Sequence, residues 1–319
     1  QSLAAASIAY LHALNYAKER LQGSSLLEMK NPEAPRVPIV QHADVRRMLL
    51  WMKAHVEGFR ALTYYTAYCE DLVRASADEA LRDKSKGIIE VLTPIVKAYC
   101  SDMAFKVTEL AIQTYGGYGY CSEYPVEQFM RDLKIASIYE GANGIQALDL
   151  VGRKLGMKKG MYFMSLLGEM NATVAAYQGN AALKDLASDV QKSVNTLAEL
   201  AMYFAGSAKA GKFLIPVGNA YPFLMLMGKV VMGWLLLWEA GVARERLEGI
   251  ASAKGIDLSD GGQVSALAKA DADAAFYIGK VSAARYFIKH VLPEVDAAVT
   301  SIKSEDLSMI DIPEEAFAS

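Results

Sequence analysis

Residues 183–204 read LKDLASDVQKSVNTLAELAMYF, and their apolar members recur at alternating steps of three and four. This spacing places the apolar side chains on one face of an α-helix. The face consists of Leu183, Leu186, Val190, Val194, Leu197, Ala201 and Phe204. Because such a face is buried when helices pack side by side, we predict a helix of an antiparallel bundle here.

Helical patterns extend over most of the chain. Alternating apolar and polar runs, which mark half-buried strands, are nearly absent. We therefore predict an all-α protein, with residues 23–40 as an extended loop because Pro32, Pro35 and Pro38 interrupt any helix there. The predicted helices cover residues 2–22, 44–75, 88–115, 126–138, 145–155, 161–178, 183–204, 221–248 and 264–301.

Two glycines, Gly156 and Gly160, separate two regions that differ in the length of their predicted helices and in the turns between them. Before them, glycine-rich turns join the helices, and after them the helices are long. We predict a first domain over residues 1–155 and a second helical bundle over residues 156–319, ending in a loosely attached tail from residue 304. The length of 319 residues and the 53% hydrophobic content allow one or two cores.

Charge and composition exclude several kinds of partner. The net charge is -3, with 33 basic and 36 acidic residues interspersed, so we expect no nucleic acid. The most apolar stretch, residues 221–238, contains Pro222 and Lys229, which favours a core helix over a membrane span. The four histidines and three cysteines lack metal-ligand or disulfide spacing, so we expect no metal and a reducing, cytoplasmic location.

A glycine cluster lies at residues 113–120, QTYGGYGY. Glycines let backbone N–H groups approach a phosphate, but the dinucleotide-binding version needs a preceding strand and a third glycine. Here a helix precedes the cluster, and Ser122 stands where that glycine is required. Taken alone, the cluster is typical of a helix end followed by a turn.

An ordered string of short motifs follows the cluster: EYPVE at 123–127, RDLKI at 131–135, IYEG at 138–141 and IQ at 145–146. Together with QTYGGYGY, this string resembles the C-terminal signature of the acyl-CoA dehydrogenases. The similarity extends back to YAKERLQG at 16–23 and covers about residues 1–155. The remainder is similar in size and position to the C-terminal extension of a longer, mostly bacterial branch that includes 3-methylmercaptopropionyl-CoA dehydrogenase.

The resemblance implies an FAD-dependent oxidoreductase that desaturates an acyl-CoA thioester to trans-2-enoyl-CoA. In the family, the glutamate of the Y-E-G motif takes the α-proton while the β-hydrogen leaves as hydride to flavin N5. That glutamate corresponds to Glu140, between the predicted substrate contacts Tyr139 and Gly141. A break between helices at residues 140–144 would let the Glu140 side chain project into a cleft.

The resemblance also implies residues for FAD and partners for the enzyme. The predicted FAD contacts, made to the flavin of a neighbouring subunit, are Arg20, Gln22, Gln113, Gly116 and Gly117. A homodimer or homotetramer with shared flavin sites follows, with electron-transfer flavoprotein as the acceptor. The chain departs from the family pattern where Ala142 replaces the usual threonine, whose hydroxyl serves the adenosine region.

The family's N-terminal helical domain and middle β-domain have no counterpart in these 319 residues. We therefore expect this polypeptide to be inactive by itself, as a piece of a larger enzyme. Two alternatives remain. An acyl-CoA oxidase would use the same base and flavin but pass electrons to O₂, and a non-catalytic helical assembly module would need neither.

Overall fold

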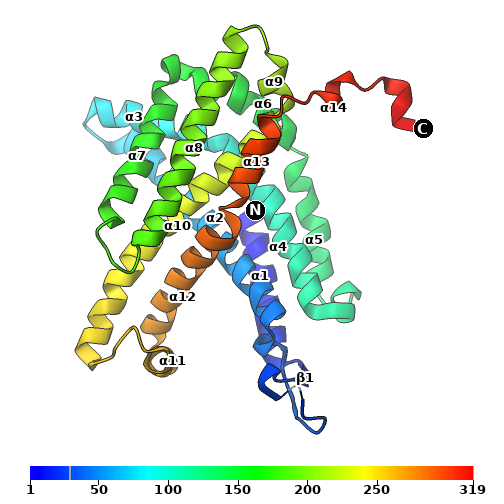
Figure 1. The fold of residues 1–319 in the computed structure, drawn as a ribbon, viewed down its shortest axis with the longest axis vertical. Helices are drawn as coiled ribbons and strands as arrows, with labels where there is room; N and C mark the ends of the chain where they lie inside the picture. Colours follow the sequence, from blue (N-terminus) through cyan, green and yellow to red (C-terminus); the bar gives the residue numbers. More distant parts are fainter. Residues whose placement is uncertain (29, 319) are drawn as a thin grey trace. The chain divides into compact units, whose positions relative to one another are not determined.

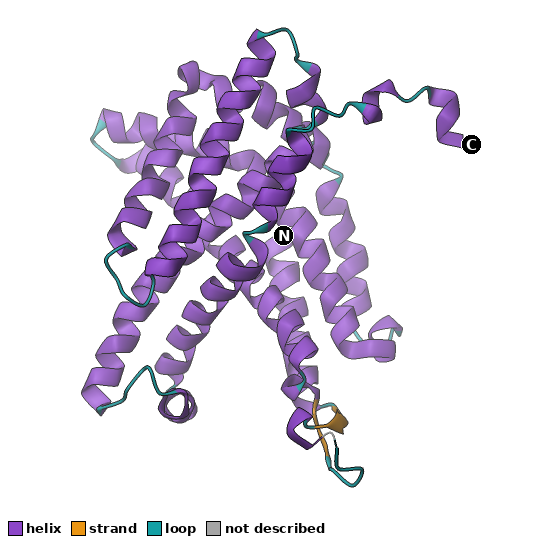
Figure 2. Ribbon diagram, viewed as in Figure 1, coloured by secondary structure: helices purple, strands orange, loops and turns teal. Residues whose placement is uncertain are grey.

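The computed structural model describes residues 1–28 and 30–318, and it confirms the predicted all-α class (Figure 2). The helices, labelled in Figure 1, are α1 Ser2–Glu19, α2 Ala43–Ala75, α3 Glu79–Pro94, α4 Cys100–Tyr115, α5 Val126–Leu133, α6 Asn143–Gly152, α7 Met161–Tyr177, α8 Lys184–Lys209, α9 Leu214–Gly218, α10 Ala220–Lys254, α11 Gly261–Ala270, α12 Ala272–Tyr286, α13 Glu294–Ile302 and α14 Ser308–Asp311. The strands β1 Leu21–Ser24 and β2 Arg36–Pro38 pair antiparallel.

The chain forms two compact units, and both are discontinuous in sequence. Unit 1 consists of residues 1–60 and 100–140, and unit 2 consists of residues 61–99 and 141–319. These units group residues by contact. The predicted domains, 1–155 and 156–319, instead divide the chain where the predicted helices become longer. That division stays a prediction.

Unit 1 is built around the packing of α1 on α4. Ala6, Ala9, Ala13 and Ala17 form a fully buried stripe along α1. Their small side chains let a second helix approach closely. α1 ends at Glu19, before the predicted end at residue 22, and Arg20 is already extended, with φ −68° and ψ 120°. The chain then enters the ribbon of β1 and β2, so the predicted loop contains a short two-stranded segment.

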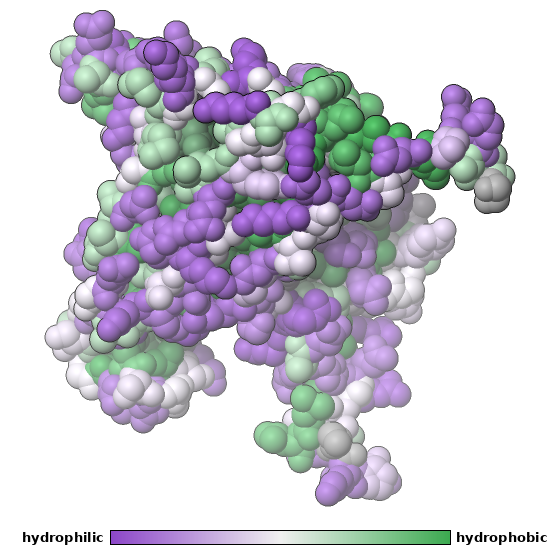
Figure 3. Space-filling model, turned by 45° about the horizontal axis from the view of Figure 1, so that its top comes forward, coloured by the Kyte–Doolittle hydropathy of each residue, from purple (hydrophilic) through white to green (hydrophobic). Residues whose placement is uncertain are grey.

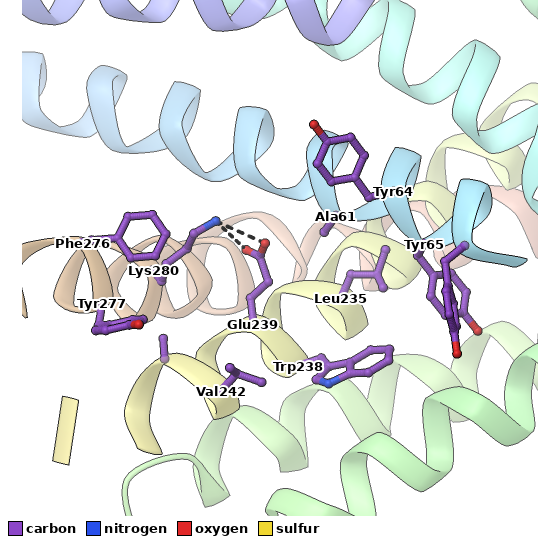
Figure 4. A pocket seen from close by; sticks show the side chains of 12 residues that line it. Ala61, Tyr64, Tyr65, Leu235, Trp238, Glu239, Val242, Phe276, Tyr277 and Lys280 are labelled. Carbon is purple, nitrogen blue, oxygen red and sulfur yellow. Dashed lines mark hydrogen bonds and ion pairs between the residues drawn. The ribbon is translucent and has the colours of Figure 1, made fainter. Parts of the chain in front are cut away.

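Unit 2 has α10 at its centre, in contact with α6, α7, α8, α12 and α13 (Figure 1). Within the described residues, α10 is the one helix long and apolar enough to cross a membrane, and 78% of its most apolar window is buried inside the fold. Its apolar character is accounted for by packing. The tail beyond α13 returns to the unit at α9, where Met309 and Ile310 lie opposite Gly218. The space-filling view shows apolar surface beside this tail (Figure 3).

Some predicted helix bounds are wrong. α3 begins at Glu79 rather than at residue 88, because the Asp78 side chain accepts hydrogen bonds from the N–H groups of Ala80 and Leu81 and caps the helix. The predicted helix 264–301 is divided into α11, α12, a π-helical turn η7 (Phe287–Val291) and α13. Asp271, in an extended conformation, ends α11 and caps α12.

Candidate active site

The five predicted FAD contacts line one groove of unit 1, with a volume of about 720 Å³. Arg20 and Gln22 reach it from the end of α1 and from β1, and Gln113 from the last turn of α4. Gly116 and Gly117 reach it from the 3₁₀ turn η4, Gly116–Tyr120, that follows α4. The structure thus gathers five polar or glycine positions from segments almost a hundred residues apart.

Arg20 is exposed at the groove and held in place by its backbone and by an aromatic ring. Its N–H donates to the Tyr16 carbonyl at 2.8 Å, and its carbonyl accepts from the N–H of Ile39 at 2.8 Å. Its guanidinium carbon lies 5.4 Å from the centre of the Tyr118 ring. A cation over an aromatic face is stabilised by the ring quadrupole, so the charge of Arg20 is held beside the groove.

The glycine cluster leaves part of the groove wall as bare backbone. Gly116 has φ +63°, the left-handed conformation that ends a helix and that favours glycine. A Cβ atom built on Gly116 or Gly117 would meet no other atom within 4 Å. A ligand can therefore approach the main chain at these two positions more closely than it could approach any residue with a side chain.

The groove has further lining residues that the sequence did not single out as contacts. His42 donates from Nε2 to the Gln22 carbonyl at 2.6 Å, and a carbonyl only accepts, so Nε2 carries the hydrogen. The rings of Tyr16 and Tyr115 stack at 4.0 Å between their centres. Cys121 adds an exposed thiol. These residues stand out little in the sequence, because only the folding of the β1–β2 ribbon and the helix ends brings them to the groove.

Glu140 lies in a turn with an unusual backbone. It has φ 55°, and Gly141 directly after it has φ 84°. A glutamate in this left-handed region costs about 1–3 kcal/mol, which the surrounding structure must supply. The Glu140 side chain is exposed, and Tyr139 beside it is half-buried. Neither these two residues nor Gly141 belongs to the lining of the groove around Arg20.

Helix α6 begins immediately after this turn, without a side-chain cap. Ala142 holds the N-cap position and has no side-chain oxygen to accept a hydrogen bond. The first helical residue, Asn143, is buried at 6% exposure. Its Oδ1 accepts from Lys97 Nζ at 2.7 Å, and its Nδ2 donates to the Ala98 carbonyl at 3.3 Å. Both partners belong to the π-helical turn η3, Ile95–Tyr99.

The charged residues of α5, between the glycine cluster and the Y-E-G motif, pair with side chains of their own helix. Arg131 Nε donates to Glu127 Oε2 at 2.7 Å, one helical turn away on α5. This hydrogen bond to Arg131 holds the pKa of the Glu127 carboxyl below its usual value. Gln128 Nε2 donates to Asp132 at 3.3 Å. In the described part of the chain, no group of three or more His, Cys, Asp and Glu side chains is placed to hold a metal ion.

Comparisons with known proteins bear on both halves of the chain. Residues 1–156 match the family model for the acyl-CoA dehydrogenase C-terminal domain, and residues 166–313 match the model "Acetyl-CoA dehydrogenase C-terminal like". The chain belongs to the acyl-CoA dehydrogenase family. Two relatives in the family are each 36% identical. The broad-specificity linear acyl-CoA dehydrogenase FadE5 of Mycobacterium tuberculosis aligns over 99% of this chain and 50% of its own length.

The second relative is 3-methylmercaptopropionyl-CoA dehydrogenase of Ruegeria pomeroyi, aligned over 97% of this chain and 48% of its own length. Among solved structures, an acyl-CoA dehydrogenase of Bacillus anthracis complexed with FAD has the same fold, with a TM-score of 0.65 at 17% identity. The alignment covers 98% of this chain and 48% of the Bacillus anthracis chain. The chain therefore spans about half the length of the relatives it matches.

Proposed function

We propose that this chain supplies the C-terminal part of an FAD-dependent acyl-CoA dehydrogenase. The reaction is the α,β-desaturation of an acyl-CoA thioester to trans-2-enoyl-CoA. The observation that carries the proposal is the groove of unit 1, because it collects Arg20, Gln22, Gln113, Gly116 and Gly117 at one place. Relatives named as acyl-CoA dehydrogenases support the choice of chemistry.

The groove residues fit the dinucleotide end of FAD. The planar guanidinium of Arg20 suits phosphate oxygens, which it binds with two parallel hydrogen bonds. The amides of Gln22 and Gln113 offer both donors and acceptors for hydroxyl and adenine groups. Gly116 and Gly117 leave open space beside the main chain. A groove of about 720 Å³ lies within the size range of cofactor sites.

Glu140 is the proposed base. Its carboxylate would take the α-proton of the thioester, and bound FAD would supply the acceptor for the β-hydrogen as hydride. An exposed carboxylate at the end of unit 1 can reach a substrate, and the left-handed turn at Glu140 and Gly141 fixes where the side chain leaves the backbone. Strained backbone of this kind is concentrated at functional sites, which supports the assignment. Tyr139 and Gly141 would contact the same thioester.

Glu140 lies outside the lining of the groove that holds Arg20. We propose that the groove binds the adenosine half of a neighbouring subunit's FAD, so that a homodimer or homotetramer completes each site. Electron-transfer flavoprotein is the proposed acceptor. An acyl-CoA oxidase would instead return the reduced flavin's electrons to O₂, and the oxygen reactivity of the reduced enzyme distinguishes the two activities.

The test uses the full-length flavoprotein under anaerobic conditions. An acyl-CoA should bleach the flavin absorbance of the wild type. Glu140→Gln should retain FAD and lose bleaching, because the amide cannot accept the α-proton. Arg20→Met should weaken FAD binding while leaving Glu140 in place. A protein that stays colourless with added FAD, or a Glu140→Gln variant that bleaches at the wild-type rate, would contradict the proposal.

A further inference from the structure

The turn that contains Glu140 needs a support that the sequence motif itself does not provide. Glu140 is a non-glycine residue in the left-handed region, so it stores strain that must be offset nearby, whereas Gly141 adopts its positive φ freely. The usual device at the start of the next helix is a capping side chain, and Ala142 has none to offer. The next residue, Asn143, makes side-chain hydrogen bonds that can hold this segment.

The Asn143 side chain makes two hydrogen bonds to one short segment, η3. Lys97 has only donors and the Ala98 carbonyl only accepts, so the orientation of the Asn143 amide between them is fixed. The amide is buried, so breaking either bond leaves a polar group without solvent to replace its partner. Asn143 thus anchors the start of α6 three residues after Glu140.

The anchor exists because η3 is a π-helical turn. Pro94, directly before it, has no N–H group and cannot continue the regular helical bonding. The resulting π turn separates α3 from α4 and presents Lys97 and the Ala98 carbonyl together at one point. π turns inside helices are frequently found at functional sites. Here the turn provides both partners that one amide side chain requires.

We propose that Asn143 and Lys97 are positioning residues for Glu140, acting through the main chain of residues 140–143. The inference rests on the proposed function of Glu140 as the base. A proton transfer depends steeply on geometry, and a displacement of about 1 Å can cost about 100-fold in rate. Loss of the anchor lets the turn relax and moves the Glu140 carboxylate away from the α-carbon, with no change at the groove that binds FAD.

The experiment isolates proton transfer from hydride transfer in the FAD-loaded, full-length enzyme. An acyl-CoA whose β-carbon carries no hydrogen, such as 3,3-dimethylbutanoyl-CoA, can lose and regain its α-proton but cannot be oxidised. Exchange of the α-hydrogens in D₂O, followed by NMR, therefore reports on the base alone. Asn143→Ala and Lys97→Met should slow exchange about 10- to 100-fold. Lys97→Arg, which keeps a cationic donor, should retain more of the exchange than Lys97→Met.

The matched control is Thr173→Val, which removes the 2.8 Å hydrogen bond from Trp234 Nε1 to Thr173 Oγ1 in the same unit. It should lower the melting temperature without slowing exchange. Equal exchange rates in Thr173→Val, Asn143→Ala and Lys97→Met would overturn the inference and leave the role of Glu140 intact. If Asn143→Ala does not fold, the exchange rates of Lys97→Met and Lys97→Arg test the inference. Exchange that is absent in the wild type, or undiminished in Glu140→Gln, would reject the proposed function itself.

Discussion

Ala142 holds the N-cap position of α6 with φ −53° and ψ 154°, a backbone conformation that serine adopts readily. We predict that Ala142→Ser stabilises the protein by about 1 kcal/mol, because the hydroxyl can accept a hydrogen bond from an N–H group of the first helical turn. The measurement is the midpoint of denaturant unfolding. Ala142→Val, which adds bulk without an acceptor, serves as the control and should give no such gain. Equal midpoints for the serine and valine variants would contradict the capping argument.

At the level of single residues, the sequence predicted positions better than it predicted conformations. The five groove residues were chosen from their motifs, and they lie together in the structure. Their role in FAD binding stays a prediction. The left-handed backbone of Glu140 had no signal, since glutamate carries no preference for it. The hydrogen bonds of Asn143 could not be predicted from the sequence either, because they depend on a π turn 46 residues earlier in the chain.

At the level of helices, α10 depends on glycines where other helices cross it. A Cβ atom on Gly228 would lie 2.2 Å from the buried ring of Tyr99. We predict that Gly228→Ala destabilises the protein by about 1–3 kcal/mol, the usual cost of overpacking a core. Gly249 on the same helix has open space around it, so Gly249→Ala should stabilise by about 0.5–1 kcal/mol. Thermal unfolding of the two variants should therefore shift in opposite directions, and a shared direction would contradict this packing.

The helical periodicity predicted the existence of these elements, and the local chemistry at their ends explains the errors. The start of α3 was missed because the charged stretch before residue 88 hid a helix whose cap, Asp78, is a single side chain. The break between α11 and α12 was missed because Asp271 interrupts an otherwise continuous helical pattern. Apolar spacing reports which face is buried, but it does not report where a capping carboxylate ends the hydrogen bonding.

For the whole molecule, carboxylates paired with basic side chains make the free energy of unfolding depend on pH under acidic conditions. Hydrogen bonds from Lys158, Lys254 and Lys212 lower the pKa of Asp83, Asp271 and Glu305 in unit 2. A carboxyl whose pKa is lowered by folding adds stability above its unfolded pKa of about 4, and this stability is lost as the pH falls through the folded value.

We therefore predict that these groups leave the free energy of unfolding unchanged between pH 7 and pH 5 and reduce it progressively below about pH 4.5. Tryptophan fluorescence during urea unfolding measures this, since Trp234 and Trp238 both lie in unit 2. Because the pairs are exposed, 1 M NaCl should weaken the dependence by screening. Constant stability from pH 5 to pH 2 would contradict the prediction.

Because the two units alternate along the sequence, the parts of each unit are synthesised at different times. Residues 61–99 emerge from the ribosome before unit 1 is complete, yet the rest of their own unit begins only at residue 141. At about 5–20 residues per second, this segment must wait several seconds or more for its partners. During that interval its apolar side chains have no finished core, so this segment stays open to chaperones for longer than residues 1–60, whose unit is complete at residue 140.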